Sequence, residues 1–522
     1  MHGFLTSSIG VTCAAALALP LTAAPTTATA ATGRAASAPA QAPASAYVPG
    51  STQSLPLTPL TGDRASTAPG TAQQGVPRRD TRNFSLVGVV WDDPATELHG
   101  RVQVRTRATA TGTWSAWQDL ETHNADHAAD PGTAESASGR VRGATAPLWV
   151  GESDGVEVRV RAGDEDGTED ATTSPLPTGM RLELVDPGEG TPPQPPTDAA
   201  ASGEGPRTTA VTTETTETAA ETAETAETAE TAETGETAET AETTGTAETT
   251  ESVEPVGAAA EAVGSAESAE VFASVEGLDA SAANAGLAPL GATEIPALSR
   301  IQTESELLTL GTLTEQQKAK PYIGPRPSIT TRRGWGANEK LREKKFVYTK
   351  KVKAAFVHHS ATGNNYRCSQ APPVIRSIYR YHVKSMGWRD IGYNFLVDKC
   401  GKIYEGRAGG VSKPVLGAHT MGFNSNSMGI AVLGTYGSKK PSSAAVKAVA
   451  RLTAWKLGLY GMNPRGKTYL KSGGGNLYRK GKNVRLNVIS GHRDGFATSC
   501  PGKQLYGKLG TARSSAAKYQ GR

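Results

Sequence analysis

Four residues capable of metal chemistry come after two predicted strands in the C-terminal part of this 522-residue chain. His358 and His359 end the apolar run KAAFVHH, and His492 and Cys500 follow a second apolar run. Imidazole and thiolate together favour Zn²⁺, and a site with three protein ligands keeps a fourth position for water. A zinc ion in such a site lowers the pKa of its water to about 7 and polarises carbonyl groups.

The spacing of these residues does not by itself separate a zinc site from unrelated residues. His492 and Cys500 are eight positions apart, His358 is far from both in the sequence, and none of the compact zinc signatures fits. Surface histidines and a buried free cysteine would give the same pattern. From spacing alone, both interpretations stay open.

The elements expected around these residues alternate between strands and helices. Pro372 and Pro373 begin a predicted helix that continues to about Met386, and Ser442 or Ser443 caps a second one. The predicted strands cover 353–359, 393–397, 402–405, 428–433 and 484–489. This order predicts an α/β domain over 325–522, with a central mixed β-sheet flanked by helices.

Five motifs in this C-terminal part occur in a fixed order. They are RRGWGA (332–337), FVHHSAT (356–362), GWRDIGYNFLVDKCGKIYEGR (387–407), GAHTMGFNSNSMGIAVLG (417–434) and SGHRDGFATSCPG (490–502). Together they resemble the peptidoglycan recognition protein family and its relatives, the phage-lysozyme-type N-acetylmuramoyl-L-alanine amidases. The resemblance covers roughly 325–510 and implies a zinc amidase. The signal-like start of the chain predicts secretion, and the Ala/Thr/Gly-rich composition suggests a bacterial origin.

The resemblance also implies a role for each matching residue. His358, His492 and Cys500 match the zinc ligands, Tyr393 the tyrosine that faces the oxyanion, and Thr498 a second hydrogen-bond donor to it. Non-catalytic members of the family typically lack the cysteine, which this chain keeps. We therefore expect hydrolysis of the amide bond between N-acetylmuramic acid and L-alanine; the alternative is a module that recognises peptidoglycan without cutting it.

Other polar residues in the motifs are candidate substrate contacts. Arg407 can meet the carboxylate of the stem peptide or form a structural pair, and His382 lies on an apolar helix face where a core histidine is equally consistent. His359 is expected to be structural because adjacent strand residues face opposite ways. The candidate substrate-binding set is His382, Arg407, His419 and Asn424.

The cysteine count is informative if the chain is exported to an oxidising compartment. Cys13 belongs to a predicted signal peptide, and an odd number of three cysteines is left. This indicates one disulfide and one thiol with another use, such as metal ligation. We predict a Cys368–Cys400 disulfide, whose loop closure is worth about 3–4 kcal/mol.

The rest of the chain is predicted to contain one further folded domain. We expect a signal peptide over 1–31, a disordered linker over 32–79, a small all-β sandwich over 80–187 and an acidic Ala/Glu/Thr linker over 188–320. The tryptophans of the β domain serve either as its core or as a surface for stacking sugars.

The charge is divided unequally along the chain. Residues 321–522 hold 37 Lys and Arg against 6 Asp and Glu, a formal charge of +31, and the remainder holds 17 against 45, or −28. A body this basic favours a polyanionic partner. For an exported chain without stacking aromatics among its basic runs, we expect peptidoglycan and anionic wall polymers, not nucleic acid. We expect a monomer, secreted and associated with the cell wall, without a membrane-spanning segment.

Overall fold

The computed structural model describes residues 49–60, 73–122, 124–163, 175–189 and 280–522. The predicted signal peptide lies outside the described residues, and so does most of the predicted acidic linker. Contacts assign 47–522 to one compact unit, which contains two folded domains. No helix of the described residues is long and apolar enough to cross a membrane.

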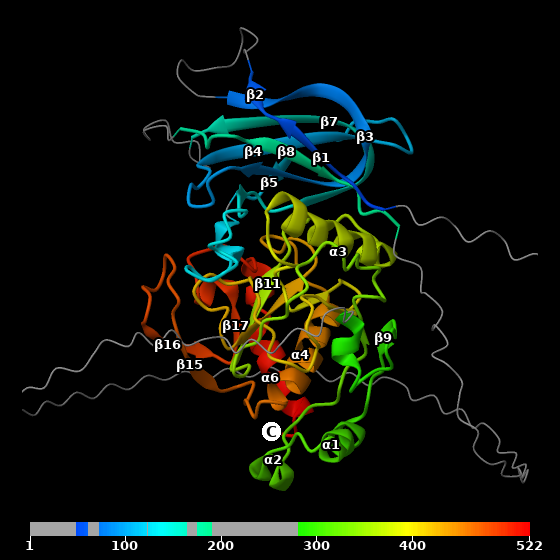
Figure 1. The fold of residues 1–522 in the computed structure, drawn as a ribbon, viewed down its shortest axis with the longest axis vertical. Helices are drawn as coiled ribbons and strands as arrows, with labels where there is room; N and C mark the ends of the chain where they lie inside the picture. Colours follow the sequence, from blue (N-terminus) through cyan, green and yellow to red (C-terminus); the bar gives the residue numbers. More distant parts are fainter. Residues whose placement is uncertain (1–48, 61–72, 123, 164–174, 190–279) are drawn as a thin grey trace, which may run out of the picture. The chain divides into compact units, whose positions relative to one another are not determined.

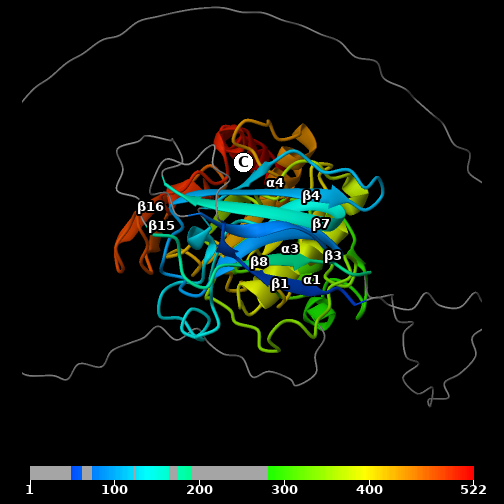
Figure 2. The same cartoon turned by 90° about the horizontal axis from the view of Figure 1, so that it is seen from above.

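The first domain is an antiparallel β-sheet, which confirms the all-β prediction. Its main strands lie side by side in the order β1-β8-β3-β7-β4-β5 (Figure 1), and Figure 2 shows β1, β8, β3, β7 and β4 from above. The strands are β1 (Thr52–Pro56), β2 (Thr58–Pro59), β3 (Gln73–Trp91), β4 (Gly100–Ala108), β5 (Gln118–Leu120), β6 (Gly143–Ala144), β7 (Leu148–Ala162) and β8 (Arg181–Val185).

Alternating valines hold this sheet together. Val102 and Val104 of β4 lie opposite Val160 and Val158 of β7, and all four side chains are buried. Because strand residues alternate between faces, this spacing places the four on one face, which covers the core. Each buried valine contributes roughly 1.5–3 kcal/mol.

The structure corrects the predicted linker over 32–79. β1, β2 and the start of β3 lie in that range, and β1 pairs with β8 from Thr52↔Val185 to Pro56↔Arg181. The segment is rich in proline and threonine, which is typical of a spacer, but prolines are tolerated on edge strands because such strands need fewer hydrogen-bond donors.

Residues 121–142 join β5 to β6, and we call them the β5–β6 segment. Their one helical turn is η1 (Ala125–His127). The other described residues of the segment form turns and irregular chain. A connection of this length without regular structure is uncommon in a compact domain and usually has a function.

The second domain has a seven-stranded mixed sheet in the order β17-β11-β14-β12-β13-β10-β9, as predicted for its fold class. The pairs β17/β11, β11/β14, β14/β12 and β13/β10 are parallel, and β12/β13 and β10/β9 are antiparallel. The strands are β9 (Glu294–Ile295), β10 (Ile329–Thr330), β11 (Ala354–His359), β12 (Phe395–Val397), β13 (Ile403–Glu405), β14 (Ser427–Val432) and β17 (Ile489–Gly491).

Helices cover both faces of this sheet. Ile430 and Val432 of β14 pack with α4 (Ser443–Gly458) and α6 (Leu509–Tyr519), whereas Ala431 packs in a separate core with α3 (Ala371–Arg380). The π-helical turn η4 (Tyr381–Ser385) continues α3. The remaining short elements are α1 (Arg300–Thr309), α2 (Glu315–Ala319), α5 (Lys503–Tyr506), η2 (Ala280–Asn284), η3 (Cys368–Gln370) and η5 (His492–Asp494).

Two predicted boundaries in this domain are wrong. The predicted linker over 188–320 ends early, because η2, β9, α1 and α2 belong to the α/β domain and Leu307 and Leu313 lie in its core. The predicted strand 484–489 is two strands, β16 (Asn483–Asn487), which pairs with β15 (Lys467–Lys471), and β17, which pairs with β11. Elements this short carry too few apolar residues for periodicity to reveal them.

The two domains share one hydrophobic core. Leu86 and Trp149 of the β domain pack in the same buried cluster as Ile378 and Tyr381 of the α/β domain. The Tyr381 hydroxyl also donates to the carbonyl of Thr145 at 3.1 Å. Trp149 is therefore a core residue, as one of the two interpretations of the tryptophans expects.

Candidate metal centre

Four buried side chains bring potential metal ligands together. They are His358 at the end of β11, His492 at the start of η5, Cys500 before α5, and His127 of the β5–β6 segment. One ligand atom from each lies within 4.8 Å of all the others. The three predicted ligands are thus brought together, and a fourth residue, which the sequence analysis missed, joins them.

The parallel arrangement of β11 and β17 explains how two of the histidines meet. Val357 of β11 lies opposite Gly491 of β17, so the next residues, His358 near the end of β11 and His492 directly after β17, lie at the same end of two parallel strands. The loop after η5 then folds back, because the Arg493 N–H donates to the carbonyl of Cys500 at 3.1 Å. Local chain geometry therefore positions three of the four ligands.

The distances between ligand atoms fit a zinc ion. His358 Nδ1 lies 3.8 Å from Cys500 Sγ, and His127 Nε2 lies 3.6 Å from the same sulfur. Tetrahedral zinc, with its usual bond lengths to nitrogen and sulfur, holds such atoms about 3.6 Å apart. Among the described residues, neither ring nitrogen of His492 has a hydrogen-bond partner. A buried imidazole without partners is costly, and a metal ion would satisfy it.

The protonation states suit ligation by the histidines. Burial lowers the pKa of His358 well below its usual range, and neighbouring His492 lowers it further. Burial also lowers the pKa of His492 to about 3, although Asp126 raises it. Burial raises the pKa of the Cys500 thiol, so this group must release a proton when it binds a metal.

Asp126 lies behind two of the histidines. Its Oδ1 is 2.9 Å from Nδ1 of His127, and its Oδ2 is 3.7 Å from Nδ1 of His492. Burial raises the pKa of Asp126, but His127 and His492 outweigh this effect and hold it below its usual range. A carboxylate on one ring nitrogen directs the other nitrogen toward a metal, which is the usual arrangement behind histidine ligands.

The two predicted oxyanion donors lie beside this cluster. The ring of Tyr393 is 5.5 Å from that of His358 and 5.9 Å from that of His127. Burial raises the pKa of Tyr393 well above its usual range, so its phenol stays protonated and can donate a hydrogen bond. Thr498 is half-buried, and its hydroxyl accepts the Cys500 N–H at 3.2 Å.

The other histidines of the domain have protein partners instead. His382 Nδ1 accepts the Gly392 N–H at 3.1 Å, and His419 Nδ1 lies 3.0 Å from the Thr420 hydroxyl. His359 lies outside the cluster, with Nε2 3.5 Å from a carboxylate oxygen of Glu121. These contacts give His382, His419 and His359 structural roles in this conformation.

The remaining predicted substrate contacts, Arg407 and Asn424, are occupied by the β5–β6 segment. The guanidinium of Arg407 forms two 2.8 Å bonds with the carboxylate of Glu135, and both side chains are buried. Asn424 donates through Nδ2 to the Asp130 carboxylate at 2.7 Å and to the Ala128 carbonyl at 2.9 Å. Neither residue is available to a substrate in this conformation.

The predicted disulfide is present. Cys368 and Cys400 are bonded, with their Cα atoms 6.2 Å apart, and Cys500 is the free cysteine of the described residues. The bond connects η3, at the start of α3, to the turn between β12 and β13.

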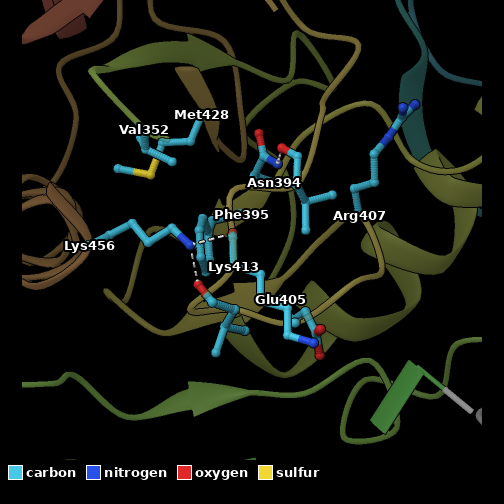
Figure 3. Close-up of a pocket in the computed structure, with 11 residues that line it drawn as sticks. Val352, Asn394, Phe395, Glu405, Arg407, Lys413, Met428 and Lys456 are labelled. Carbon is cyan, nitrogen blue, oxygen red and sulfur yellow. Dashed lines mark hydrogen bonds between the residues drawn. The ribbon is translucent and has the colours of Figure 1, made fainter. Parts of the chain in front are cut away.

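A second buried polar site lies in the same domain. Lys456 of α4 enters a pocket lined by residues that include Phe395 and Glu405 (Figure 3). Its Nζ donates to the carbonyls of Val411 and Lys413 at 2.6 and 2.7 Å. None of the four clustered ligands lines this pocket.

Comparison with known proteins agrees with this geometry. Residues 348–503 match a family model described as N-acetylmuramoyl-L-alanine amidase, and 37–181 match one described as Rv3811 N-terminal galactose-binding domain-like. Peptidoglycan-recognition protein SC2 of Drosophila simulans is 32% identical over 159 residues, which are 30% of this chain and 72% of that protein. The chain belongs to the peptidoglycan recognition protein family.

Other relatives in this family extend the similarity. Peptidoglycan-recognition protein 1 of Holotrichia diomphalia is 35% identical over 187 residues, covering 35% of this chain and 79% of that protein. The human N-acetylmuramoyl-L-alanine amidase is 31% identical over 218 residues, covering 40% of this chain but only 32% of the human protein. In this chain, the family domain is preceded by the galactose-binding-like β domain.

His127 is the candidate metal ligand that sequence reasoning missed. The string HNADHAAD (123–130) holds two histidines and two aspartates within eight residues, an unusual density for a loop between strands. That density was the available signal. His127 lies 373 positions before Cys500, and no local sequence pattern connects these two residues.

Proposed function

We propose that this protein is a zinc-dependent amidase that hydrolyses the bond between N-acetylmuramic acid and L-alanine and so releases the stem peptide of peptidoglycan. The carrying observation is the buried set of His358, His492 and Cys500, at distances that suit zinc, in a domain that matches the amidase family model. His492 adds support, because neither of its buried ring nitrogens makes a hydrogen bond among the described residues and its Nδ1 faces the Asp126 carboxylate at 3.7 Å.

The roles of the chain's residues follow from their positions. His358, His492 and Cys500 would hold the zinc ion, which when bound supplies a Lewis acid and an activated water. Tyr393, kept protonated by burial, donates a hydrogen bond to the oxygen that gains charge in the transition state. Thr498 offers a second, uncharged hydroxyl beside Cys500.

We further propose that the protein is exported and acts at the cell wall. The signal-like sequence 1–31 and the Cys368–Cys400 disulfide support export, since disulfides persist in oxidising compartments. The β15–β16 hairpin supports attachment to anionic polymers. Its exposed side chains include Lys467, Lys471, Arg479, Lys480, Lys482 and Arg485, and its inner face packs Leu470 and Val484 in a small core.

The first test compares muropeptides digested by zinc-loaded protein with and without Cys500→Ala. Mass spectrometry should detect released stem peptides with the intact site, and none with Cys500→Ala or with a chelator. Because His127 lies 3.6 Å from Cys500 Sγ, the digestion is repeated in a His127→Ala chain. His99→Ala, an exposed histidine of the β domain, is the matched control.

Two outcomes decide between the enzyme and a recognition module. If no new amino termini are released by the wild type, by His127→Ala or by His127→Ala with Asp130 and Glu135 also replaced by alanine, the amidase proposal is wrong. Recognition without hydrolysis would then leave binding to insoluble wall unchanged between the wild type and Cys500→Ala. For the enzyme, Cys500→Ala abolishes release and leaves wall binding largely intact.

A further inference from the structure

The β5–β6 segment contacts the candidate site at three places. His127 joins the metal cluster, Asp130 binds Asn424, and Glu135 binds Arg407. Asn424 and Arg407 are the residues that the sequence analysis assigned to substrate. A single stretch from the other domain thus lies where a substrate would have to bind.

His127 is placed as a metal ligand would be, and not as a residue that only packs beside the site. Its Nε2 lies 3.6 Å from Cys500 Sγ, and its Nδ1 is held by the Asp126 carboxylate at 2.9 Å. A catalytic zinc site has three protein ligands and an open position for water, whereas four protein ligands give a closed site. With His127 in place, this centre has four.

Acidic residues fix the segment to the basic domain. The segment holds four carboxylates, and each lies against the α/β domain. Glu121 accepts the Ser499 hydroxyl at 3.0 Å, Asp126 lies 3.7 Å from His492, Asp130 accepts the Gly422 N–H at 2.8 Å, and Glu135 pairs with Arg407.

The chain on the C-terminal side of the segment is held as well. The backbone N–H of Arg142 donates to Met386 at 3.1 Å, and that of Trp149 donates to Thr362 at 3.1 Å. Near the centre of the segment, the Met421 N–H donates to the Asp126 carbonyl at 2.9 Å. These backbone bonds fix the register, so His127 reaches the cluster because of the path of the whole segment.

We propose that His127 is the fourth ligand of the metal centre and that the β5–β6 segment is an internal inhibitor, which fills the substrate groove with its own carboxylates. The protein is then latent, and this latency rests on the proposed amidase function. Peptidoglycan enters only after the Glu135–Arg407 pair breaks and His127 withdraws from the metal, leaving the position that water occupies in an active site.

The ligand assignment is tested in the full chain with Co²⁺ in place of zinc and imidazole as the external probe. The visible spectrum of the wild type and of His99→Ala should not respond to imidazole. The spectrum of His127→Ala should shift, because a position on the metal is then open, and metal loss to a chelator should be about tenfold faster or more.

A second variant keeps the test decisive if His127→Ala folds poorly. His127→Cys restores a ligand, so its Co²⁺ spectrum should show stronger sulfur-to-metal absorption and again no response to imidazole. A wild-type spectrum that shifts with imidazole as much as that of His127→Ala would overturn the assignment, whatever the activity of either protein. A shift confined to His127→Ala upholds it, even if no variant cleaves peptidoglycan.

The occupation of the groove is tested with the Asp130→Ala/Glu135→Ala double variant, in which His127 is kept. Trypsin should cut after Arg140 and Arg142 about tenfold faster or more than in the wild type, while the α/β domain stays intact by mass spectrometry. Stem-peptide release should rise in the same variant, and Glu152→Ala, an exposed glutamate of the same domain, should change neither rate. Unchanged cleavage at both arginines would overturn the inhibitor proposal.

Discussion

Two buried polar sites of the α/β domain differ in how their polar atoms are satisfied. In the Lys456 pocket the side-chain Nζ donates to two backbone carbonyls of its own domain, at 2.6 and 2.7 Å. In the metal cluster, His492 is equally buried and, among the described residues, has no hydrogen-bond partner for either nitrogen. Complete satisfaction is typical of a structural group, and an unsatisfied buried group requires another explanation.

The two sites also differ in where their partners come from. Lys456 and its carbonyls lie within about 45 positions of one another, inside one domain. The metal cluster joins residues that are up to 373 positions apart and takes one of them from the β domain. A structural pocket therefore depends on one fold, whereas the metal centre depends on how two folds meet.

The largest expected effect separates metal binding from stability. His492→Ala should weaken zinc binding by more than about 100-fold, since removing even an indirect partner of a metal ligand costs 10–100-fold. The same change should alter the metal-free chain little, because it also removes two unsatisfied buried nitrogens, each costing about 1–3 kcal/mol. Zinc titration against a chromogenic chelator and urea unfolding of the metal-free protein measure the two quantities.

His492→Ala should lower the free energy of unfolding of the metal-free chain by less than it lowers the free energy of zinc binding. If the two losses are equal, the contrast between the two sites fails. Lys456→Met is the paired variant for this comparison, and its zinc affinity should match that of the wild type.

The next effect concerns the ion pair that joins the two domains. Glu135→Ala leaves the Arg407 guanidinium buried without its carboxylate, which should lower the free energy of unfolding by about 3–5 kcal/mol. Urea unfolding followed by tryptophan fluorescence measures this loss, with Glu152→Ala as the control at an exposed site. A change below about 1 kcal/mol would mean that Arg407 is solvated, and so that the segment is not docked in solution.

The smallest effect belongs to the satisfied pocket. Lys456→Met removes the donor to the carbonyls of Val411 and Lys413 and should cost about 1–3 kcal/mol of unfolding free energy. The same urea series measures it. A metal affinity that falls together with this stability would contradict the separation of the two sites.

The sequence predicts the candidate metal ligands of the α/β domain because their positions are set locally. His358 lies near the end of one strand of strong apolar pattern and His492 follows another, and parallel neighbours end at one edge of a sheet. The Cys368–Cys400 disulfide was also predicted from local positions, because one cysteine lies next to a recognisable helix and the other in a recognisable hairpin. Ordered motifs then narrowed the alternatives that spacing alone left open.

What the sequence does not predict depends on contacts between distant segments. Arg407 and Asn424 were assigned to substrate, but their partners Glu135 and Asp130 lie in the other domain, where no periodic pattern marks them. β9 was missed because a two-residue strand has no measurable alternation. In each case the deciding interaction is a pairing across a long separation, which propensity and periodicity do not contain.

The span of the ligand set has a consequence for the order of biosynthesis. A chain made from its N-terminus presents His127 373 positions before Cys500. The proposed four-ligand centre therefore cannot assemble until the α/β domain has been made as far as Cys500. A chain that stops before Cys500 lacks one of the four candidate ligands, so the complete centre would form only after the β5–β6 segment has been made.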